Sequence, residues 1–540
     1  MLSANETPEP RVDPLAPLEH AAQWLIGTTI HLALGLALGM VVARGMRSRH
    51  LHWSWAAIPV VGMFLLHPAF TGGVSTLAVA CLCAAKRGRR WHREDIDAGG
   101  DLAVIAGARS KPLDLLGALI RRAALRRRAT LGGDGWFRGD ELAIGSDEDS
   151  CTVSVPFGGA RGGAHTLVVG ATGSGKTVTQ TWIAVRAIEH GMGAVVVDPK
   201  GDPDMRSEVR HAAGLAGRPF IEWSPGGSSI YNPYARGSET EIADKALAGE
   251  RFTEPHYLRQ AQRYLGHVVR ALHAAGEEVS LTGIVHHMDP SQLECLTREL
   301  PGAQADPTHA YLDSLTARQR SDLAGVRDRL AILSESDVGP WLDPRTSGAE
   351  RFELLEAVRA RAVVYFNLES DSRPLLTQML GAAIVQDLQT TVSALQGSPI
   401  GTLVVIDEFS AIAAEQVVRL FGRARSAGFS LLLGTQELSD LRLPGHERLV
   451  DQVIGNLSVL IAHRQVVPDS AELLASLAGS RGAWRTSRHS DGRTTRTRTR
   501  EGVLGSDDIV GLGVGRAAVI VLTGGPRVRI ARIFSAHAQR

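Results

Sequence analysis

Two long apolar stretches without charged residues lie near the start of the chain. Residues 21–43 contain no Asp, Glu, Lys or Arg, and residues 51–85 form a second uncharged stretch. A helix needs about 20 apolar residues to cross a bilayer, so the first stretch predicts one membrane span. The second stretch is long for one crossing and short for two, and Pro59 and Pro68 interrupt it. We therefore expect a transmembrane anchor over residues 1–93.

Basic residues follow both apolar stretches. Three arginines lie within residues 44–49, and five basic residues lie within 86–93. The positive-inside rule places both clusters in the cytoplasm, so everything after Lys86 is expected there. Two topologies compete. The first has three crossings, with the second stretch forming a hairpin that turns near His67 and Pro68. The second has two crossings and a basic outer loop. We favour the hairpin.

The segment 94–150 is predicted to link this anchor to the rest of the chain and to include the start of the next domain. Within it, residues 111–128 place leucine and isoleucine at roughly helical spacing and carry five arginines after position 120. Such a helix binds an anionic membrane surface in some proteins and is a solvated linker in others. Both interpretations stay open for this helix.

Downstream of residue 150, short β-branched runs alternate with helical stretches. Strands are predicted at 166–169, 194–197, 363–366, 402–408, 431–433 and 459–462, with the last strands within 517–534. Helices are predicted at 178–190 and 375–395, among others. Alternation of this kind predicts an α/β fold with a central, mostly parallel sheet and helices on both faces. Residues 235–358 look helical, lack a clear strand and are too long for a simple connection.

A complete phosphate-loop pattern follows the first of these strands. Its glycines let backbone N–H groups wrap phosphates at a helix start. The lysine would reach the β- and γ-phosphates, and the following threonine would hold Mg²⁺. The predicted nucleotide-binding residues are Gly170, Ala171, Thr172, Gly173, Ser174, Gly175, Lys176 and Thr177.

Polar residues follow other strands and are expected at the same edge of the sheet, because ligands bind at the carboxyl ends of parallel strands. The strand at 402–408 ends in Asp407 and Glu408, and Asp407 is the expected Mg²⁺ partner. Glu408 is then placed to polarise an attacking water. Gln436 could sense the γ-phosphate or orient that water, and Asp198 is expected to converge on the same place.

Composition changes this picture little. The 540 residues have a formal net charge of +1, so nucleic acid would need a local basic site. Lysine occurs five times against 53 arginines, a bias that weakens any argument from arginine-rich stretches. Residues 481–500 hold seven arginines and one acid, and the alternation of Thr and Arg at 494–500 predicts a strand. We expect either DNA-phosphate contacts from Arg493, Arg496, Arg498 and Arg500, or an exposed hairpin that reflects codon bias alone.

Five motifs in one order resemble a known family. They are GATGSGKT at 170–177, DPKGD at 198–202, WSPGGSSIYNPY at 223–234, VVIDEFSAI at 404–412 and RARSAGFSLLLGTQ at 423–436. This order is similar to that of type IV secretion coupling proteins, the conjugative TraG/TraD-type ATPases of the FtsK–HerA group. The resemblance covers about residues 165–535. It implies a RecA-like P-loop NTPase domain over 151–234 and 359–540, with the helical domain at 235–358 inserted in it.

The resemblance also implies a function and partners. ATP and Mg²⁺ would drive a homo-hexamer that brings relaxase-bound single-stranded DNA to the type IV secretion channel and helps to pump it. The helical insert would meet substrate or relaxosome. The protein would be a multi-pass protein of the cytoplasmic (inner) membrane with its ATPase domain in the cytoplasm. The family usually has two spans around a periplasmic segment, which differs from the favoured hairpin.

Three other functions compete with DNA export. A chromosomal double-stranded DNA translocase of the FtsK type is one, although only SAHAQR follows the last predicted strands, where that type places a DNA-reading domain. An ATPase that exports polypeptide is another. A nucleotide-gated scaffold is the third, and Glu408 and Gln436 count against it because a scaffold needs no group that activates water.

Ring-forming NTPases complete each site with an arginine from the neighbouring subunit. Arg423 and Arg425 precede the strand that leads to Gln436, and the family resemblance places its arginine finger in this neighbourhood. From their position in the sequence, we expect both to lie near the active edge of the sheet. A pair of surface arginines at a helix end is the competing interpretation.

Overall fold

The computed structural model describes residues 16–48, 53–57, 74–97, 134–158, 163–250, 252, 254–412, 414–442, 448–488, 494–524 and 527–537. The chain separates into two compact units. One comprises Met1–Ala124 with Gly482–Glu501, and the other comprises Leu125–Arg481 with Gly502–Arg540. The predicted basic helix at 111–128 and the predicted turn at His67 and Pro68 lie outside the described residues.

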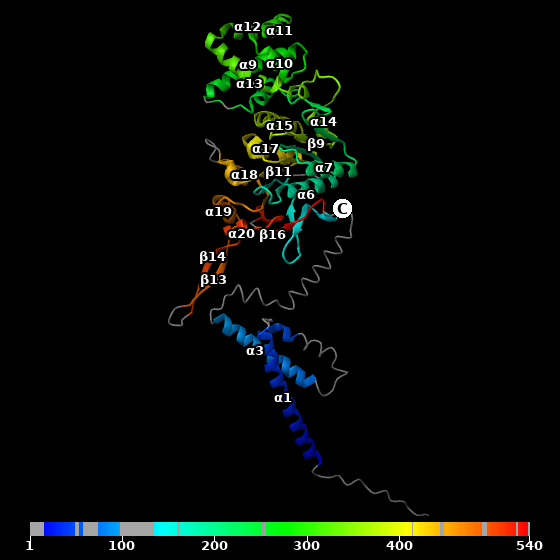
Figure 1. Cartoon of the computed structure of the whole chain (residues 1–540), viewed down its shortest axis with the longest axis vertical. Helices are drawn as coiled ribbons and strands as arrows, with labels where there is room; N and C mark the ends of the chain where they lie inside the picture. Colours follow the sequence, from blue (N-terminus) through cyan, green and yellow to red (C-terminus); the bar gives the residue numbers. More distant parts are fainter. Residues whose placement is uncertain are drawn as a thin grey trace, which may run out of the picture. The chain divides into compact units, whose positions relative to one another are not determined.

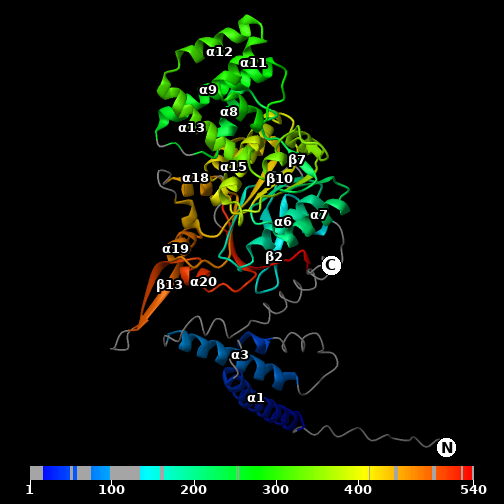
Figure 2. The same cartoon turned by 45° about the horizontal axis from the view of Figure 1, so that its top comes forward.

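The larger unit is built on one sheet, which has twelve strands in the described part of the chain (Figures 1 and 2). Its order is β1-β2-β16-β15-β12-β4-β11-β10-β5-β9-β6, with β3 paired to β2. The strands are β1 Phe137–Arg138, β2 Glu141–Ser146, β3 Thr152–Pro156, β4 Thr166–Val169, β5 Gly193–Asp198, β6 Phe220–Trp223, β9 Val363–Asn367, β10 Thr402–Ile406, β11 Phe429–Thr435, β12 Val459–Ala462, β15 Arg516–Val521 and β16 Arg527–Ile533.

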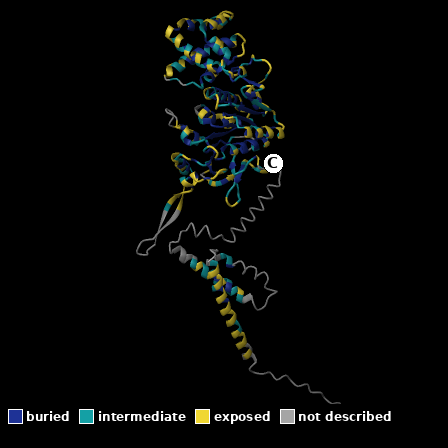
Figure 3. Cartoon of the chain, viewed as in Figure 1, coloured by how far each residue is buried: buried dark blue, intermediate teal, exposed yellow. Residues whose placement is uncertain are grey.

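The strands from β12 to β6 pair in parallel, as the sequence predicts. β15, β16, β2, β1 and β3 extend the sheet with antiparallel pairs, an extension that the alternating pattern does not reveal. The residues of β4, β5 and β10 are all buried, because helices cover both faces of a parallel sheet (Figure 3). The sheet contains four consecutive parallel strands, in the order β4, β11, β10 and β5. The residues that follow these strands therefore lie along the same carboxyl edge of the sheet.

Two apolar cores, one on each face, hold the helices to the sheet. One core includes Trp182 and Ile183 of α6 together with Met205 and Val209 of α7. The other core includes residues of α15, α17, α18 and α19. The helices around the sheet are α6 Lys176–Glu189, α7 Pro203–Leu215, α14 Leu354–Arg359, α15 Pro374–Ala394, α16 Phe409–Ile412, α17 Ala414–Ala424, α18 Leu449–Asn456, α19 Pro468–Leu477 and α20 Ser506–Val510, with 3₁₀ turns η3 Asp134–Trp136, η6 Arg425–Ala427 and η7 Leu438–Leu441.

The segment expected to be helical forms α8 Glu239–Leu247, α9 Pro255–Ala274, α10 Leu281–His287, α11 Pro290–Arg298, α12 Gly302–Ser314 and α13 Ala317–Ser334, followed by the 3₁₀ turn η5 Gly339–Trp341. Side-chain caps at Ser238 and Thr316 begin α8 and α13. One short strand, β8 Glu350–Phe352, lies within this segment and pairs in parallel with β7 Ser229–Tyr231. Three residues are too few to produce a recognisable alternation, which explains why the sequence did not predict β8.

The smaller unit contains α1 Ala16–Ser48, η1 Trp53–Ala57 and α3 Val74–Asp97. Among the described residues, one helix is long and apolar enough to cross a membrane, at Ala21–Met46 of α1, and its apolar side chains are largely exposed (Figure 3). A Cβ on Gly35 would lie 2.8 Å from the Thr76 carbonyl, and one on Gly39 would lie 2.7 Å from that of Ala80. These glycines therefore let α1 and α3 approach closely. Gly35 faces Thr76 and Gly39 faces Ala80, so residue numbers increase in the same direction along both helices, and the helices run parallel.

The smaller unit also includes most of a two-stranded hairpin, β13 Ser480–Arg488 and β14 Thr494–Gly502. The strand predicted from the Thr and Arg alternation corresponds to β14. Arg493 and the predicted turn around it lie outside the described residues.

Candidate nucleotide site

The phosphate-loop sequence forms the turn between β4 and α6. Gly173 and Gly175 have φ angles of 74° and 108°, a region that strongly favours glycine. At Gly170, an added Cβ would lie 2.5 Å from Ser174 Oγ and 2.7 Å from His463 Cβ. The loop therefore needs these glycines for its own geometry, and it presents the start of α6 at the carboxyl edge of the sheet.

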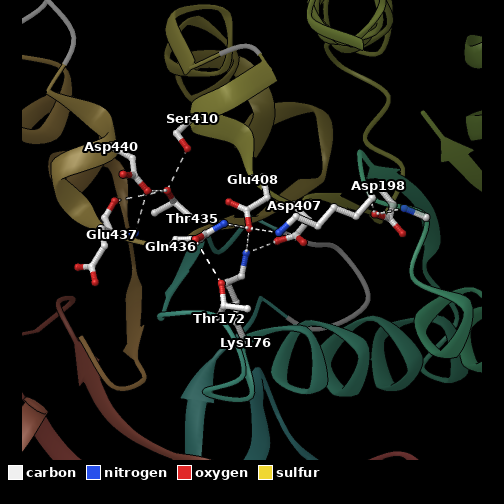
Figure 4. A network of polar contacts seen from close by, with 12 residues as sticks. Thr172, Lys176, Asp198, Asp407, Glu408, Ser410, Thr435, Gln436, Glu437 and Asp440 are labelled. Atoms are coloured by element: carbon white, nitrogen blue, oxygen red, sulfur yellow. Dashed lines mark hydrogen bonds and ion pairs between the residues drawn. The ribbon is translucent and has the colours of Figure 1, made fainter. Parts of the chain in front are cut away.

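Lys176 lies between the two predicted carboxylates. Its Nζ donates to Asp407 Oδ1 and to Glu408 Oε1, both at 2.8 Å, and all three side chains are buried (Figure 4). The chain brings them together from positions more than 200 residues apart, because β4 and β10 are separated only by β11 in the sheet. The sequence predicted this convergence.

Glu408 has an unusual backbone and an unusually crowded carboxylate. Its φ angle is 45°, which is uncommon for a residue with a side chain and typical of functional sites. Burial alone would raise the pKa of its carboxyl, but the ammonium groups of Lys176 and Lys200 outweigh burial and lower that pKa. Glu408 is therefore held as a carboxylate.

Gln436 joins the same group through its side chain. Its Nε2 donates to Glu408 Oε1 at 3.1 Å, and its Oε1 accepts from Thr172 of the phosphate loop at 3.4 Å. Gln465, which lies three residues after β12, donates to the Gln436 carbonyl at 3.3 Å. Gln436 thus connects the candidate base to the phosphate loop, a position suited to the predicted role of sensing a phosphate.

Asp198 does not converge on this group, and that expectation is wrong. Its carboxylate accepts from the backbone N–H groups of Lys200, Gly201 and Asp202 and from the Tyr365 hydroxyl. The local turn uses its acceptors before any ligand could. The residue that reaches the site from this turn is Lys200, which donates to Glu408 Oε1 at 2.9 Å. The position of Lys200 just after β5, at the carboxyl edge of the sheet, could have indicated from the sequence that it belongs to the site.

The residues at this edge suit a nucleotide with Mg²⁺. Thr177, predicted as a metal ligand, is half-buried in the first turn of α6, and Asp407 is the second predicted ligand. A Cβ at Gly434 of β11 would lie 2.4 Å from Asp407 Oδ1 and from Gln180 Nε2, so this glycine leaves room for both side chains. A hydroxyl and a carboxylate are hard oxygen ligands, which Mg²⁺ prefers together with phosphate oxygens.

A buried histidine that the sequence did not indicate supports the loop. His463 Nε2 accepts from Thr179 Oγ1 of α6 at 2.7 Å, and Nδ1 donates to the Arg516 carbonyl at 3.1 Å. Burial lowers the pKa of His463 to about 4, so the ring is neutral at physiological pH. Next to it, the Gly515 N–H donates to the Ser174 carbonyl at 3.0 Å. The start of β15 therefore braces the phosphate loop.

Arg423 and Arg425 lie elsewhere, and the expectation that they are near the active edge of their own chain is wrong. Both are exposed and precede β11, whose seven residues place them about 20 Å from its carboxyl end. α17 runs back along the sheet, which carries its last residues to the amino edge. Arg425 Nη2 donates to the Asn456 carbonyl at 3.1 Å and to Ser458 Oγ at 3.3 Å.

The predicted DNA-binding arginines are partly described. Arg496, Arg498 and Arg500 are alternate residues of β14, and Arg500 is exposed. The structure thus contains the predicted strand, whereas Arg493 lies outside the described residues.

Comparison with known proteins adds sequence relatives. Residues 402–511 match the family model described as the TraM recognition site of TraD and TraG. The chain is 21% identical over 400 residues to the type 4 coupling protein DotL of Legionella pneumophila, covering 61% of this chain and 49% of DotL. It is also 33% identical over 101 residues to an uncharacterized protein of Mycoplasma pneumoniae, covering 18% of this chain and 67% of that protein. The chain thus spans about half of DotL.

Solved structures of a coupling protein share the fold. The bacterial conjugative coupling protein TrwB superposes with a TM-score of 0.56 at 18% identity, covering 74% of this chain and 93% of the TrwB chain. TrwB in complex with ADP and Mg²⁺ superposes with a TM-score of 0.54, also at 18% identity, covering 69% of this chain and 85% of that chain. The five ordered motifs, the family model matched over residues 402–511 and the likeness to DotL support a type IV coupling protein of the TraD/TraG type, and TrwB shares the fold.

Proposed function

We propose that this protein is a membrane-anchored, ATP-driven DNA translocase that couples relaxase-bound single-stranded DNA to a type IV secretion channel. The observation that carries the proposal is the cluster of Lys176, Asp407, Glu408 and Gln436 at one edge of a TrwB-like sheet. The match to the TraM recognition site supports a relaxosome and secretion-channel components as partners.

Each residue of the cluster has a role in ATP hydrolysis under this proposal. Bound ATP with Mg²⁺ supplies the phosphoryl group and the metal charge. Lys176 and the loop N–H groups would bind the phosphates, and Thr177 with Asp407 would hold the metal. Glu408 accepts a proton from the attacking water, and Gln436 orients that water. The positive φ of Glu408 is strain that such a role would explain.

The β13–β14 hairpin is the proposed DNA contact. Arginines at alternate positions of β14 present repeated positive charge, which suits the phosphates of a nucleic acid strand. A double-stranded DNA translocase and a protein exporter are the alternatives. The TrwB-like fold, found in a conjugative coupling protein, favours DNA transfer.

The direct test is ATP hydrolysis by the full-length protein in lipid nanodiscs, with and without single-stranded and double-stranded DNA. We expect hydrolysis that single-stranded DNA stimulates more than double-stranded DNA. Replacing Arg496, Arg498 and Arg500 with Gln should reduce the salt slope of single-strand binding by about 0.7 per lost contact. Equal affinity and slope would assign the arginines to codon bias, and stimulation only by double-stranded DNA would favour the FtsK-type alternative.

A homo-hexamer with a trans-acting arginine is also proposed. Arg423 and Arg425 are exposed and far from their own site, as a residue that serves a neighbouring subunit must be. Subunits with Arg423→Ala or Arg425→Ala can be mixed with Lys176→Ala subunits. Recovered turnover in mixed rings would support a finger, because some interfaces then join an intact loop to an intact arginine. Full activity of both arginine variants alone would exclude it.

The multi-pass anchor is proposed with three crossings. α1 and α3 run parallel, so the chain between them must return to the other side if both helices cross the bilayer. Their basic C-terminal ends then emerge on one side, as the positive-inside rule requires. Single cysteines at positions 48 and 71 test this in intact cells. Labelling of position 71 but not 48 from outside supports three crossings, and labelling of position 48 contradicts them.

A further inference from the structure

Lys200 is a second ammonium group on the candidate base. Its Nζ lies 2.9 Å from Glu408 Oε1, and its side chain is 46% exposed. The same carboxylate oxygen also accepts from Lys176 and from Gln436. None of the roles proposed above for the cluster uses Lys200, so its contact with Glu408 needs an explanation of its own.

Lys200 projects from a turn with a defined conformation. Asp198 Oδ1 accepts from the backbone N–H groups of Lys200 and Gly201, both at 2.9 Å. Gly201 has a φ angle of 73°, and an added Cβ there would meet Asn367 Oδ1 at 2.4 Å. Asp202 then caps α7 through the N–H groups of its first turn. The turn is held from both ends, so the backbone of Lys200 is fixed relative to β5.

Charge balance shows why a second cation is needed. In the structure Lys176 donates to both carboxylates, yet a phosphate-loop lysine must also bind phosphate oxygens. When Lys176 turns to phosphate, Glu408 keeps only a neutral amide donor from Gln436 unless Lys200 stays. An unpaired carboxylate with 8% of its side chain exposed would be costly to keep ionised.

We propose that Lys200 is a positioning residue for Glu408, which keeps this carboxylate paired with a cation and aimed while Lys176 binds phosphate. This inference rests on the proposed ATPase function. Lys200 acts through Glu408 and does not contact the reacting atoms. Its partial exposure lets the ammonium stay hydrated on one side, so holding it there costs less than burying a third charge.

The pKa of Lys200 is consistent with this role. Burial would lower that pKa, but the carboxylates around Lys200, Glu408 above all, outweigh burial and raise it, so Lys200 stays protonated.

The test is steady-state ATP hydrolysis by full-length Lys200→Met and Lys200→Arg proteins in nanodiscs. For Lys200→Met we expect kcat to fall about 10-fold at pH 7 with KM for ATP little changed, because the base is no longer aimed while the phosphate contacts are kept. Lys200→Arg should restore most of kcat. Arg210→Met removes another exposed cation, on α7, which pairs with Glu222 of β6, and should leave kcat unchanged.

The same kinetics separate this inference from the proposed function. An unchanged kcat in Lys200→Met, or a loss that Lys200→Arg does not restore, would overturn the inference, while hydrolysis by the unaltered protein would still support the proposed function. If the unaltered protein did not hydrolyse ATP, the proposed function would fail, and the inference would fail with it.

Discussion

Two buried lysines of this protein, Lys176 and Lys245, pair with carboxylates in the same unit, and they differ in what else surrounds the charge. Lys245 Nζ donates to the carbonyls of Pro233 and Arg236, at 2.9 and 2.6 Å, and to Asp387 Oδ1 at 2.7 Å. The other oxygen of Asp387 accepts from the Tyr231 hydroxyl at 2.7 Å. All three N–H bonds of this ammonium group are used.

Lys176 lies in a less complete arrangement. Two of its N–H groups reach carboxylates, and the nearby side-chain atoms Ser174 Oγ, Gln180 Nε2 and Gln180 Oε1 are buried without a partner. A network of buried polar groups that is fully satisfied stabilises one arrangement. A network that contains unused donors and acceptors can instead exchange hydrogen-bond partners when a ligand binds. We infer that the Lys245 cluster is a brace between α8 and α15, whereas the Lys176 cluster is suited to bind a ligand.

The largest expected effect that tests this contrast is that of Lys176→Ala. Turnover of ATP should fall at least ~1,000-fold, because the developing phosphate charge loses its principal cation. The free energy of unfolding should change less than in a Lys245 variant. Steady-state kinetics measure the turnover of ATP, and urea unfolding measures the free energy of unfolding. Strong destabilisation with retained turnover would reverse the two assignments.

Glu408→Gln separates binding from chemistry within the site. We expect ATP to bind with near-normal affinity and kcat to fall ~100- to 1,000-fold, because the base is lost while the metal and phosphate contacts are kept. Calorimetric titration and single-turnover kinetics distinguish the two steps. Near-normal hydrolysis would remove Glu408 from the mechanism.

Lys245→Met should act on stability. The substitution leaves Asp387 buried and unpaired, and burial already raises the pKa of its carboxyl. We expect about 3 kcal/mol of lost unfolding free energy and easier proteolysis near Arg236, with KM for ATP little changed in the folded fraction. The double variant Lys245→Met with Asp387→Leu is the matched control and should recover part of the loss. No recovery would show that the pair itself is not the brace.

The smallest expected effect concerns His463. Its pKa of about 4 lies below the ordinary value of 6.5, so the unfolded chain binds the proton more readily between these pH values. Stability should therefore fall as pH decreases from 6.5 towards 4, by about 2 kcal/mol between pH 7 and pH 5 from this residue. His463→Gln should show a correspondingly flatter pH dependence in urea unfolding. Parallel curves for the two proteins would contradict this linkage.

The sequence predicted much of the fold because the relevant signals are local. Continuous apolar runs mark β4, β10 and β12, and the predicted bounds of β12 agree with the structure. The phosphate loop and the Asp407–Glu408 pair are recognisable from adjacent residues, and the rule that ligands bind at carboxyl ends brought them together correctly. The helical insert followed from the absence of a clear strand pattern, with only β8 missed.

Other features depend on contacts between residues far apart in the chain. Local sequence does not reveal that the Asp198 carboxylate accepts hydrogen bonds from its own turn and from Tyr365. It also does not reveal that Lys200 reaches Glu408, which is 208 positions away in the chain. The same is true of His463 beneath the phosphate loop and of the antiparallel extension of the sheet. Arg425 was misplaced because its distance in sequence from Gln436 says nothing about which end of β11 it occupies.

The sequence by itself determined which residues could bind a nucleotide, since residue types and short spacings fix that chemistry. The tertiary structure decided which of those residues share a partner, because burial and the sheet order set the few atoms within hydrogen-bonding distance. Lys176 and Lys245 show this division most clearly. Both are lysines at the start or end of an amphipathic helix, and only the atoms around each ammonium group distinguish a site from a brace.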